Sequence, residues 1–144
     1  MAGGKATTFD NDLLKLIFNG TPIPNLADNA ATSPLTNLYA SLHTADPGVG
    51  GTQTTSEAAY TSYARVAISR TSSGFTVSTN TCTLTASVTF PTPTGGSETE
   101  TYFAIGTASS GTGKILYRGP LTPSVIISVG TPPQLTTGTT ITES

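Results

Sequence analysis

Residues 82–90 carry the most regular alternation of apolar and polar positions in the chain. Every second residue from Cys82 to Phe90 is apolar, and Thr or Ser stands at each position between. This two-residue period is typical of a strand with one buried and one solvated face. Residues 62–70 alternate in the same way, and residues 71–74 that follow are rich in turn formers. The pattern predicts two strands of one antiparallel sheet.

Further short apolar runs, separated by Gly, Pro and Ser turns, continue this pattern along the chain. They lie at residues 35–43, 75–77, 101–107, 114–118 and 124–129, with a last pair around 134–135 and 140–141. About eight strands at this spacing are typical of a sandwich, jelly roll or barrel. We therefore expect an all-β fold, a β-sandwich or jelly roll with one short N-terminal helix.

Apolar residues at helical spacing occur near residues 9–19, where Thr8 or Asp10 can cap the first turn and Gly20 can end the last one. We expect a flexible arm over residues 1–8, then one β-domain over 9–144. Within that domain we expect the helix, a Pro-containing loop at 20–35, and strands from residue 36 on. A short amphipathic helix can act as a lid on the sheet core or as a hook on a neighbouring subunit. For the hook, the candidate interface residues are Phe9, Leu13, Ile17, Phe18, Ile23 and Leu26.

Composition narrows the class of protein. A chain of 144 residues suits one domain. Only 10% of the residues are charged and 35% are hydrophobic, where globular domains average about 25% charged. The net charge of −2 and the pI near 5.1 give no electrostatic reason to expect nucleic acid or an anionic membrane as a partner. The first residues lack the apolar segment of a secretory signal, and no apolar run is long enough to span a membrane, so we expect synthesis in the cytoplasm.

Few residues offer chemistry. Cys82 falls on the apolar face of its strand, so we expect a buried structural thiol. His43 is the single histidine, which excludes zinc or copper sites built from several His and Cys residues. A Ser–His–Asp arrangement is allowed by composition, since His43, Asp46 and many serines are present, but no Gly-x-Ser-x-Gly motif accompanies them. We predict no catalytic, cofactor or metal site, and no enzyme.

Two motifs invite a functional interpretation. Residues 106–114 are similar to a phosphate-binding loop, but Ala108 and Ile115 occupy positions that require Gly and Ser or Thr, so we interpret the segment as a hairpin tip. Glu98 and Glu100 alternate on a strand. They can form a carboxylate pair for glycoside cleavage, or they can keep a strand edge soluble, which is the interpretation we favour.

Five blocks, in this order along the chain, resemble a family of small virion proteins of tailed bacteriophages: residues 38–48, 62–67, 88–94, 102–107 and 115–122. Members of that family are similar either to tail fibre proteins or to capsid cement and decoration proteins. No catalytic residue accompanies the blocks. The resemblance implies a structural protein that is located in the virion.

The resemblance leaves three functions open. We favour a capsid decoration or cement protein on the capsid exterior, which binds the major capsid protein and stabilises the shell, because the chain lacks the heptads expected of an extended fibre. The alternative is a tail, neck or baseplate fibre subunit for host attachment. In either case the partners are other virion proteins and copies of the chain itself, and we expect no small-molecule substrate. The third hypothesis is a carbohydrate-binding module that uses aromatic platforms; its candidates are Tyr39, Tyr60, Tyr63, Tyr102 and Tyr117.

Overall fold

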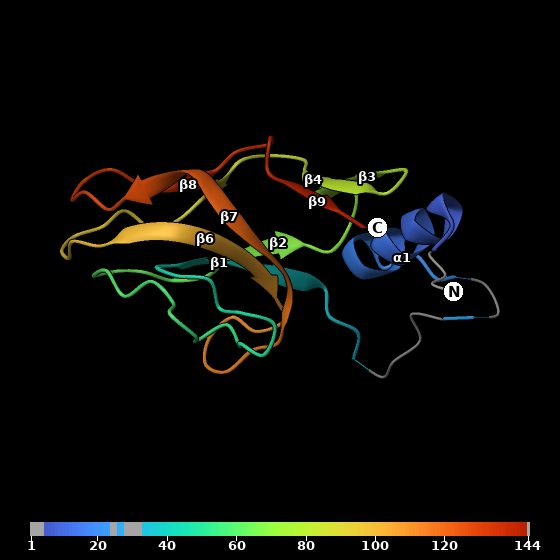
Figure 1. Cartoon of the computed structure of the whole chain (residues 1–144), viewed down its shortest axis with the longest axis horizontal. Coiled ribbons are helices and arrows are strands. Elements are labelled where there is room, and N and C mark those ends of the chain that lie inside the picture. The colour runs from blue at the N-terminus through green and yellow to red at the C-terminus, as the bar shows by residue number, and fades with distance from the viewer. Residues whose placement is uncertain (1–4, 24–25, 28–32, 144) are drawn as a thin grey trace. The chain divides into compact units, whose positions relative to one another are not determined.

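The computed structural model describes residues 5–23, 26–27 and 33–143. Within them the chain forms one helix and nine strands (Figure 1). The elements are α1 (Thr7–Asn19), β1 (Asn37–His43), β2 (Val66–Ser69), β3 (Phe75–Ser78), β4 (Thr81–Leu84), β5 (Val88–Thr89), β6 (Thr99–Gly106), β7 (Ile115–Ile126), β8 (Gln134–Leu135) and β9 (Thr140–Thr142). The expected all-β class with one short N-terminal helix is confirmed.

The strands form three antiparallel sheets. Their strand orders are β2-β1-β6-β7, β3-β4-β9 and β5-β8. Separate antiparallel sheets fit the expected sandwich-like class. The chain divides into two compact units: the first comprises residues 1–37, 69–87 and 136–144, and the second comprises residues 38–68 and 88–135. The expectation of a single domain over 9–144 stays a prediction.

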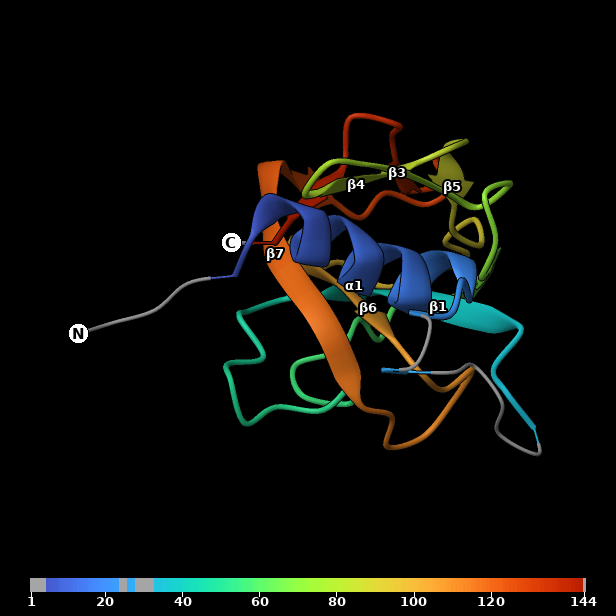
Figure 2. The same ribbon diagram turned by 90° about the vertical axis from the view of Figure 1, so that its right-hand side faces the viewer.

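The first unit is built from α1 and the β3-β4-β9 sheet. Leu14 and Phe18 lie one turn apart on the buried face of α1, and the ring of Phe18 packs against Phe75 of β3 at 4.8 Å between centroids. Figure 2 shows α1 alongside β3 and β4. Cys82 of β4 pairs with Val77 and Ile141 and is 1% exposed. The buried thiol is therefore confirmed, and burial raises its pKa to about 12.

The second unit is centred on β1, which lies between β2 and β6. Leu38, Ala40 and Leu42 of β1 are buried, as expected for one face of the strand. Ser41 and His43 on the opposite face are also 0% exposed, because a later segment covers this face through a bridge between His43 and Glu57. The sequence therefore predicts the alternation correctly but not the cover over the polar face.

Two predicted strand assignments are wrong. Residues 62–70 and 82–90 do not share a sheet, because β2 pairs with β1, whereas residues 82–90 divide between β4 and β5. Residues 85–87 are exposed and lie where the chain passes from the first unit to the second. Conversely, the two strands expected at 114–118 and 124–129 are one strand, β7, whose register with β6 shifts between Tyr102 and Glu100. An irregular edge strand tolerates the prolines that interrupt the sequence pattern here.

The helix begins earlier than expected. Its N-cap is Ala6, which makes no side-chain capping bond, so neither Thr8 nor Asp10 caps α1, and both lie inside it. Gly20 ends the helix in the left-handed conformation, as expected. Residues 1–4 of the predicted arm, and residues 24–25 and 28–32 of the predicted loop, lie outside the described residues.

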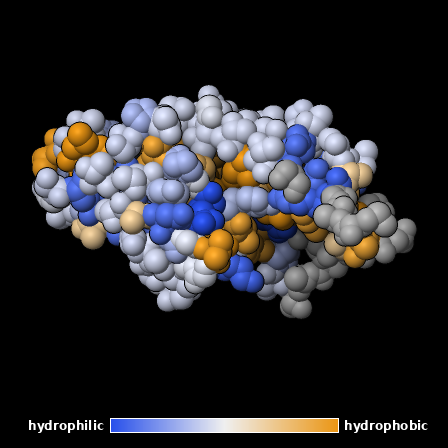
Figure 3. All heavy atoms as spheres, viewed as in Figure 1, coloured by the Kyte–Doolittle hydropathy of each residue, from blue (hydrophilic) through white to orange (hydrophobic). Residues whose placement is uncertain are grey.

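The surface is mostly of intermediate hydropathy. Figure 3 shows a largely pale face with small blue and orange groups, which is consistent with a chain of only 10% charged residues. Exposed large apolar side chains include Leu26, Val49, Ile126 and Val129. Scattered single apolar residues of this kind are ordinary in folded proteins.

Candidate functional site

The six candidate interface residues are in different surroundings. Phe9 and Leu26 are 37% and 69% exposed, whereas Phe18 and Ile23 are 0% and 9% exposed. Phe18 is part of the core of the first unit through its contact with Phe75. Phe18 is therefore not accessible to a partner in the folded unit. Ile23 is also buried. We exclude both from the proposed interface.

Phe9, Leu13 and Ile17 remain as a connected set on α1. Leu13 and Ile17 are half-buried, and the spacing of four residues places the three side chains in one row along the helix. We call this row the apolar stripe. It lies next to the buried row of Asp10, Leu14 and Phe18, so it extends the hydrophobic face of α1 to a partly exposed position.

Arg70 holds the last turn of α1. Its Nε donates to the carbonyl of Ile17 at 2.6 Å and its Nη2 to the carbonyl of Leu16 at 2.5 Å. These carbonyls belong to the last turn of the helix, where backbone acceptors lack helical partners and a cation is favourable. Nη1 also donates to the carbonyl of Leu35 at 3.2 Å. Nothing in the local sequence identifies this role, because Arg70 lies 53 residues after Ile17.

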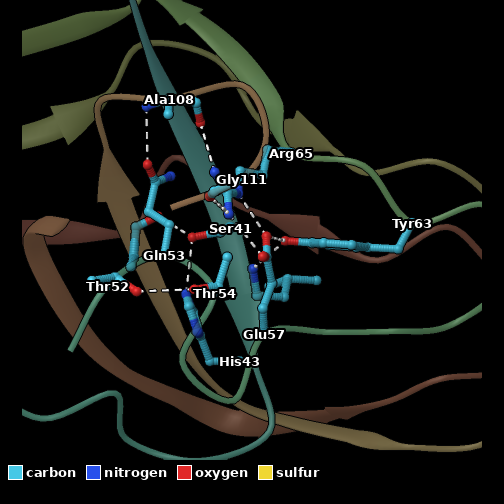
Figure 4. Close-up of polar contacts among 12 residues, drawn as sticks. Ser41, His43, Thr52, Gln53, Thr54, Glu57, Tyr63, Arg65, Ala108 and Gly111 are labelled. Carbon is cyan, nitrogen blue, oxygen red and sulfur yellow. Dashed lines mark hydrogen bonds and ion pairs between the residues drawn. The ribbon is translucent and has the colours of Figure 1, made fainter. Parts of the chain in front are cut away.

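The second unit contains a buried polar network (Figure 4). His43 Nδ1 lies 2.8 Å from the carbonyl of Thr55, so Nδ1 carries the proton and donates it. Nε2 then accepts from Ser41 Oγ at 2.9 Å. Burial lowers the pKa of His43, which favours the neutral ring that this geometry requires.

The Ser41–His43 contact has the form of a nucleophile and its base. However, both side chains are 0% exposed, so a substrate has no access to them in this structure. Asp46, the acid that composition offered for a triad, pairs with Arg118 at 2.6 Å instead. The three residues therefore do not form a triad.

Arg65 connects three segments of this network. Its Nε and Nη2 donate to the two carboxylate oxygens of Glu57 at 2.6 and 2.8 Å, and Nη1 donates to the carbonyl of Ala108 at 3.0 Å and Nη2 to that of Gly111 at 2.7 Å. Tyr63 also donates to Glu57 at 3.0 Å. Hydrogen bonding to Glu57 raises the pKa of Arg65. The arrangement fixes the loop at 107–114 rather than presenting charge to a ligand.

The predicted hairpin tip is confirmed. Gly106 pairs with Ile115 across β6 and β7, and the Thr107 N–H donates to the Lys114 carbonyl at 3.1 Å. The Gln53 side chain lies against the hairpin, where its Oε1 accepts from the N–H of Ala108 at 3.0 Å. Gln53 is 0% exposed, so the hairpin packs on this side chain.

Glu100 does not keep a strand edge soluble, because it is 0% exposed. Glu98 is half-buried and accepts through Oε1 from the N–H groups of Ala59 and Tyr60, at 2.8 and 2.7 Å. A glycosidase pair must reach both faces of a sugar, and a carboxyl without access to solvent cannot do so. Neither interpretation of the pair therefore fits Glu100, and the one that we favoured from the sequence, a soluble strand edge, is wrong for this residue.

The tyrosines offer little exposed platform. All five lie in the described part of the chain, and each is buried or half-buried. Tyr60 is 3% exposed and donates to the carbonyl of Pro91 at 3.0 Å. Tyr117 lines a shallow pocket of about 260 Å³ together with Val49 and Arg118.

Among the described residues, no group of three or more His, Cys, Asp and Glu side chains is arranged to hold a metal ion. No helix in the described part of the chain combines the length and apolar character needed to cross a bilayer.

Comparison with known proteins identifies the family. Residues 4–143 match the family model described as Podophage GP4 fiber I protein gp80. The chain belongs to this family. No curated protein matches it. The match covers nearly the whole chain, so the resemblance to small tailed-phage virion proteins is confirmed, and the protein is a structural component of the virion of the fibre type.

Proposed function

We propose that this protein is a fibre subunit attached to the tail of the phage particle, where it contributes to host attachment. The observation that supports the proposal is the family match over residues 4–143, whose description names a fibre protein. This was the second of the functions considered from sequence. Capsid decoration, the first, stays a prediction that no observation favours over the fibre.

The buried polar groups agree with a role without catalysis. Ser41, His43 and Glu100 are the residues closest to enzyme chemistry, and each is 0% exposed. Ser41 and His43 are hydrogen-bonded inside the second unit, and Glu100 is enclosed in the same unit. A protein of this kind acts by presenting the same surface in many copies, because repeated weak contacts add to a strong attachment.

The apolar stripe of α1 is the proposed attachment surface. It consists of Phe9, Leu13 and Ile17, and the exposed Leu26 follows α1 in the sequence. An amphipathic helix that places such a row in a hydrophobic groove is a common mode of protein recognition. The partner is a further virion protein or a second copy of this chain.

Deleting the gene from the phage tests the proposal. We expect particles with intact, filled heads that lack one set of fibres in electron micrographs and adsorb poorly to the host. Supplying the protein in trans restores both properties. Heads that leak or break at lower temperature, with fibres present in normal number, would contradict the fibre function and favour capsid decoration.

A further inference from the structure

Glu100 is a buried carboxyl without an ordinary partner. It lies on β6, opposite Val125 of β7, and is 0% exposed. Within the described residues, neither carboxyl oxygen has a hydrogen bond of normal geometry. An isolated buried charge costs so much free energy that such a group takes up a proton instead.

Glu98 provides an acceptor for that proton. Glu98 directly precedes β6, and its carbonyl accepts from the Ile127 N–H at 2.9 Å, so the pairing with the chain of β7 continues to this residue. Residues two apart in such a ladder project to the same face, which places Glu98 and Glu100 on one side of the chain. Glu98 Oε1 already accepts from two N–H groups, which suits a carboxylate because it has only acceptors. The second oxygen of Glu98 remains to accept from a protonated Glu100.

We infer that Glu98 and Glu100 share one proton, and that this proton holds the segment at residues 58–61 against the chain that enters β6. The segment has two further ties: the Ala58 N–H donates to the Leu42 carbonyl at 2.9 Å, and Thr61 bridges Gly95. Loss of the proton places a negative charge on the buried Glu100 beside the charge of the half-buried Glu98. The contact between Glu98 and the N–H groups of Ala59 and Tyr60 then weakens.

The groups that face Glu100 agree with this arrangement. The titratable ones are Glu98, from the chain just before β6, and Tyr60, from the segment that follows β1. The pKa of Tyr60 is raised to about 12 by burial and then by Glu100 and Glu98. From β7 the facing residue in register is the apolar Val125. Burial raises the pKa of Glu100 from 4.5 to about 8, and the charge of Glu98 contributes in the same direction.

The raised pKa of Glu100 makes the folded protein less stable as the pH rises. The folded protein keeps a proton on Glu100 up to about pH 8, whereas the unfolded chain releases it above about pH 4.5. The stability that the Glu100 proton contributes is therefore complete below pH 4.5 and decreases as the pH rises to about 8. Above about pH 8 this contribution is lost, and the stability no longer changes through Glu100. One proton changes the unfolding equilibrium constant by about tenfold per pH unit within this window.

Urea unfolding of wild type, Glu100→Gln and the control Asp12→Asn tests the inference between pH 5 and 9. The Gln amide can donate to Glu98 but does not titrate. We expect Glu100→Gln to gain stability relative to wild type by at least about tenfold in the unfolding constant between pH 5 and 8. Asp12→Asn, which removes an exposed carboxylate, should remain parallel to wild type. A difference between wild type and Glu100→Gln that is the same at every pH would overturn the inference.

A measurement on the wild type avoids dependence on how the variant folds. The chain has four glutamates, Glu57, Glu98, Glu100 and Glu143, so ¹³C labelling of glutamate gives four carboxyl resonances. One should titrate near pH 8, and the hydrogen-exchange protection of the Ala59 and Tyr60 amides should fall in the same range while that of Ala58 is kept. Four titrations below about pH 6 would overturn the inference. So would stabilisation of the wild type at pH 8 by Ca²⁺ or Mg²⁺ that is lost in Glu100→Gln, because the pair would then bind a metal ion.

Discussion

At the scale of single residues, two arginine–carboxylate pairs of the second unit differ in exposure and in the hydrogen bonds that each arginine makes, since Arg65 also binds two backbone carbonyls. The side chains of Arg65 and Glu57 are 3% and 16% exposed, whereas those of Arg118 and Asp46 are 28% and 41% exposed. The Nε–carboxylate distance is 2.6 Å in both pairs. Water screens the second pair and not the first, so removing one partner leaves an uncompensated buried charge only at Glu57.

The substitution Arg65→Gln should therefore lower the free energy of unfolding by about 3 kcal/mol. Arg118→Gln is the exposed control and should leave the free energy of unfolding nearly unchanged. Urea denaturation at pH 7 measures both. Equal losses in the two variants would show that burial does not set the strength of these pairs.

At the scale of secondary-structure elements, the end of α1 depends on one backbone conformation. Gly20 has φ of 64°, a left-handed value that is strained for any residue with a Cβ atom. Gly50 is a loop glycine that does not itself have a positive φ, and a Cβ at this residue would meet nothing within 4 Å. Replacing each glycine by alanine therefore distinguishes the cost of the left-handed backbone conformation at Gly20 from the effect of adding a methyl group at Gly50.

We expect Gly20→Ala to cost about 1 kcal/mol of unfolding free energy and Gly50→Ala less than about 0.5 kcal/mol. Thermal unfolding followed by circular dichroism measures both. If the two variants had the same stability, the left-handed end of α1 would not contribute to folding as described.

The elements themselves could largely be predicted from sequence, because alternation is a local signal. The helix, the hairpin at 107–114 and the buried Cys82 follow from residues close together in the chain. Strand partners do not, since alternation specifies a face but not a neighbour. Residues 82–90 look like one strand, although they divide between two sheets.

The polar sites were less predictable, for the same reason. Glu100 appears in sequence as a surface residue, and only the pairing of β6 with β7 reveals its burial. Arg65 and Glu57 are eight residues apart, and no local pattern connects them. Among the six candidate interface residues, Phe9 and Phe18 are nine residues apart, which places them about half a turn apart around the helix, but the sequence alone does not say which of the two sides packs on the sheet.

At the scale of the whole molecule, the protein is a member of a phage fibre family that carries an apolar stripe on its N-terminal helix. If the stripe attaches the protein to the virion, a charge at Phe9 should block incorporation. Phe9 is 37% exposed, so its replacement should leave the fold intact.

Particles assembled with Phe9→Asp should contain at least about tenfold less of this protein than wild type, since an unpaired charge in an apolar contact costs more than 1.4 kcal/mol, roughly one decade in affinity. The control Thr8→Asp adds the same charge at the neighbouring exposed position and should incorporate normally. Quantitative mass spectrometry of purified particles measures the ratio. Normal incorporation of Phe9→Asp would exclude the stripe as the attachment surface.

The most direct test of the proposed function is to locate the protein in the intact particle by cryo-electron microscopy. We predict that each compact unit fits density in a fibre joined to the tail, and that the coat-protein shell carries none. Density for the protein on the outer surface of the shell, in register with the coat subunits, would contradict the account.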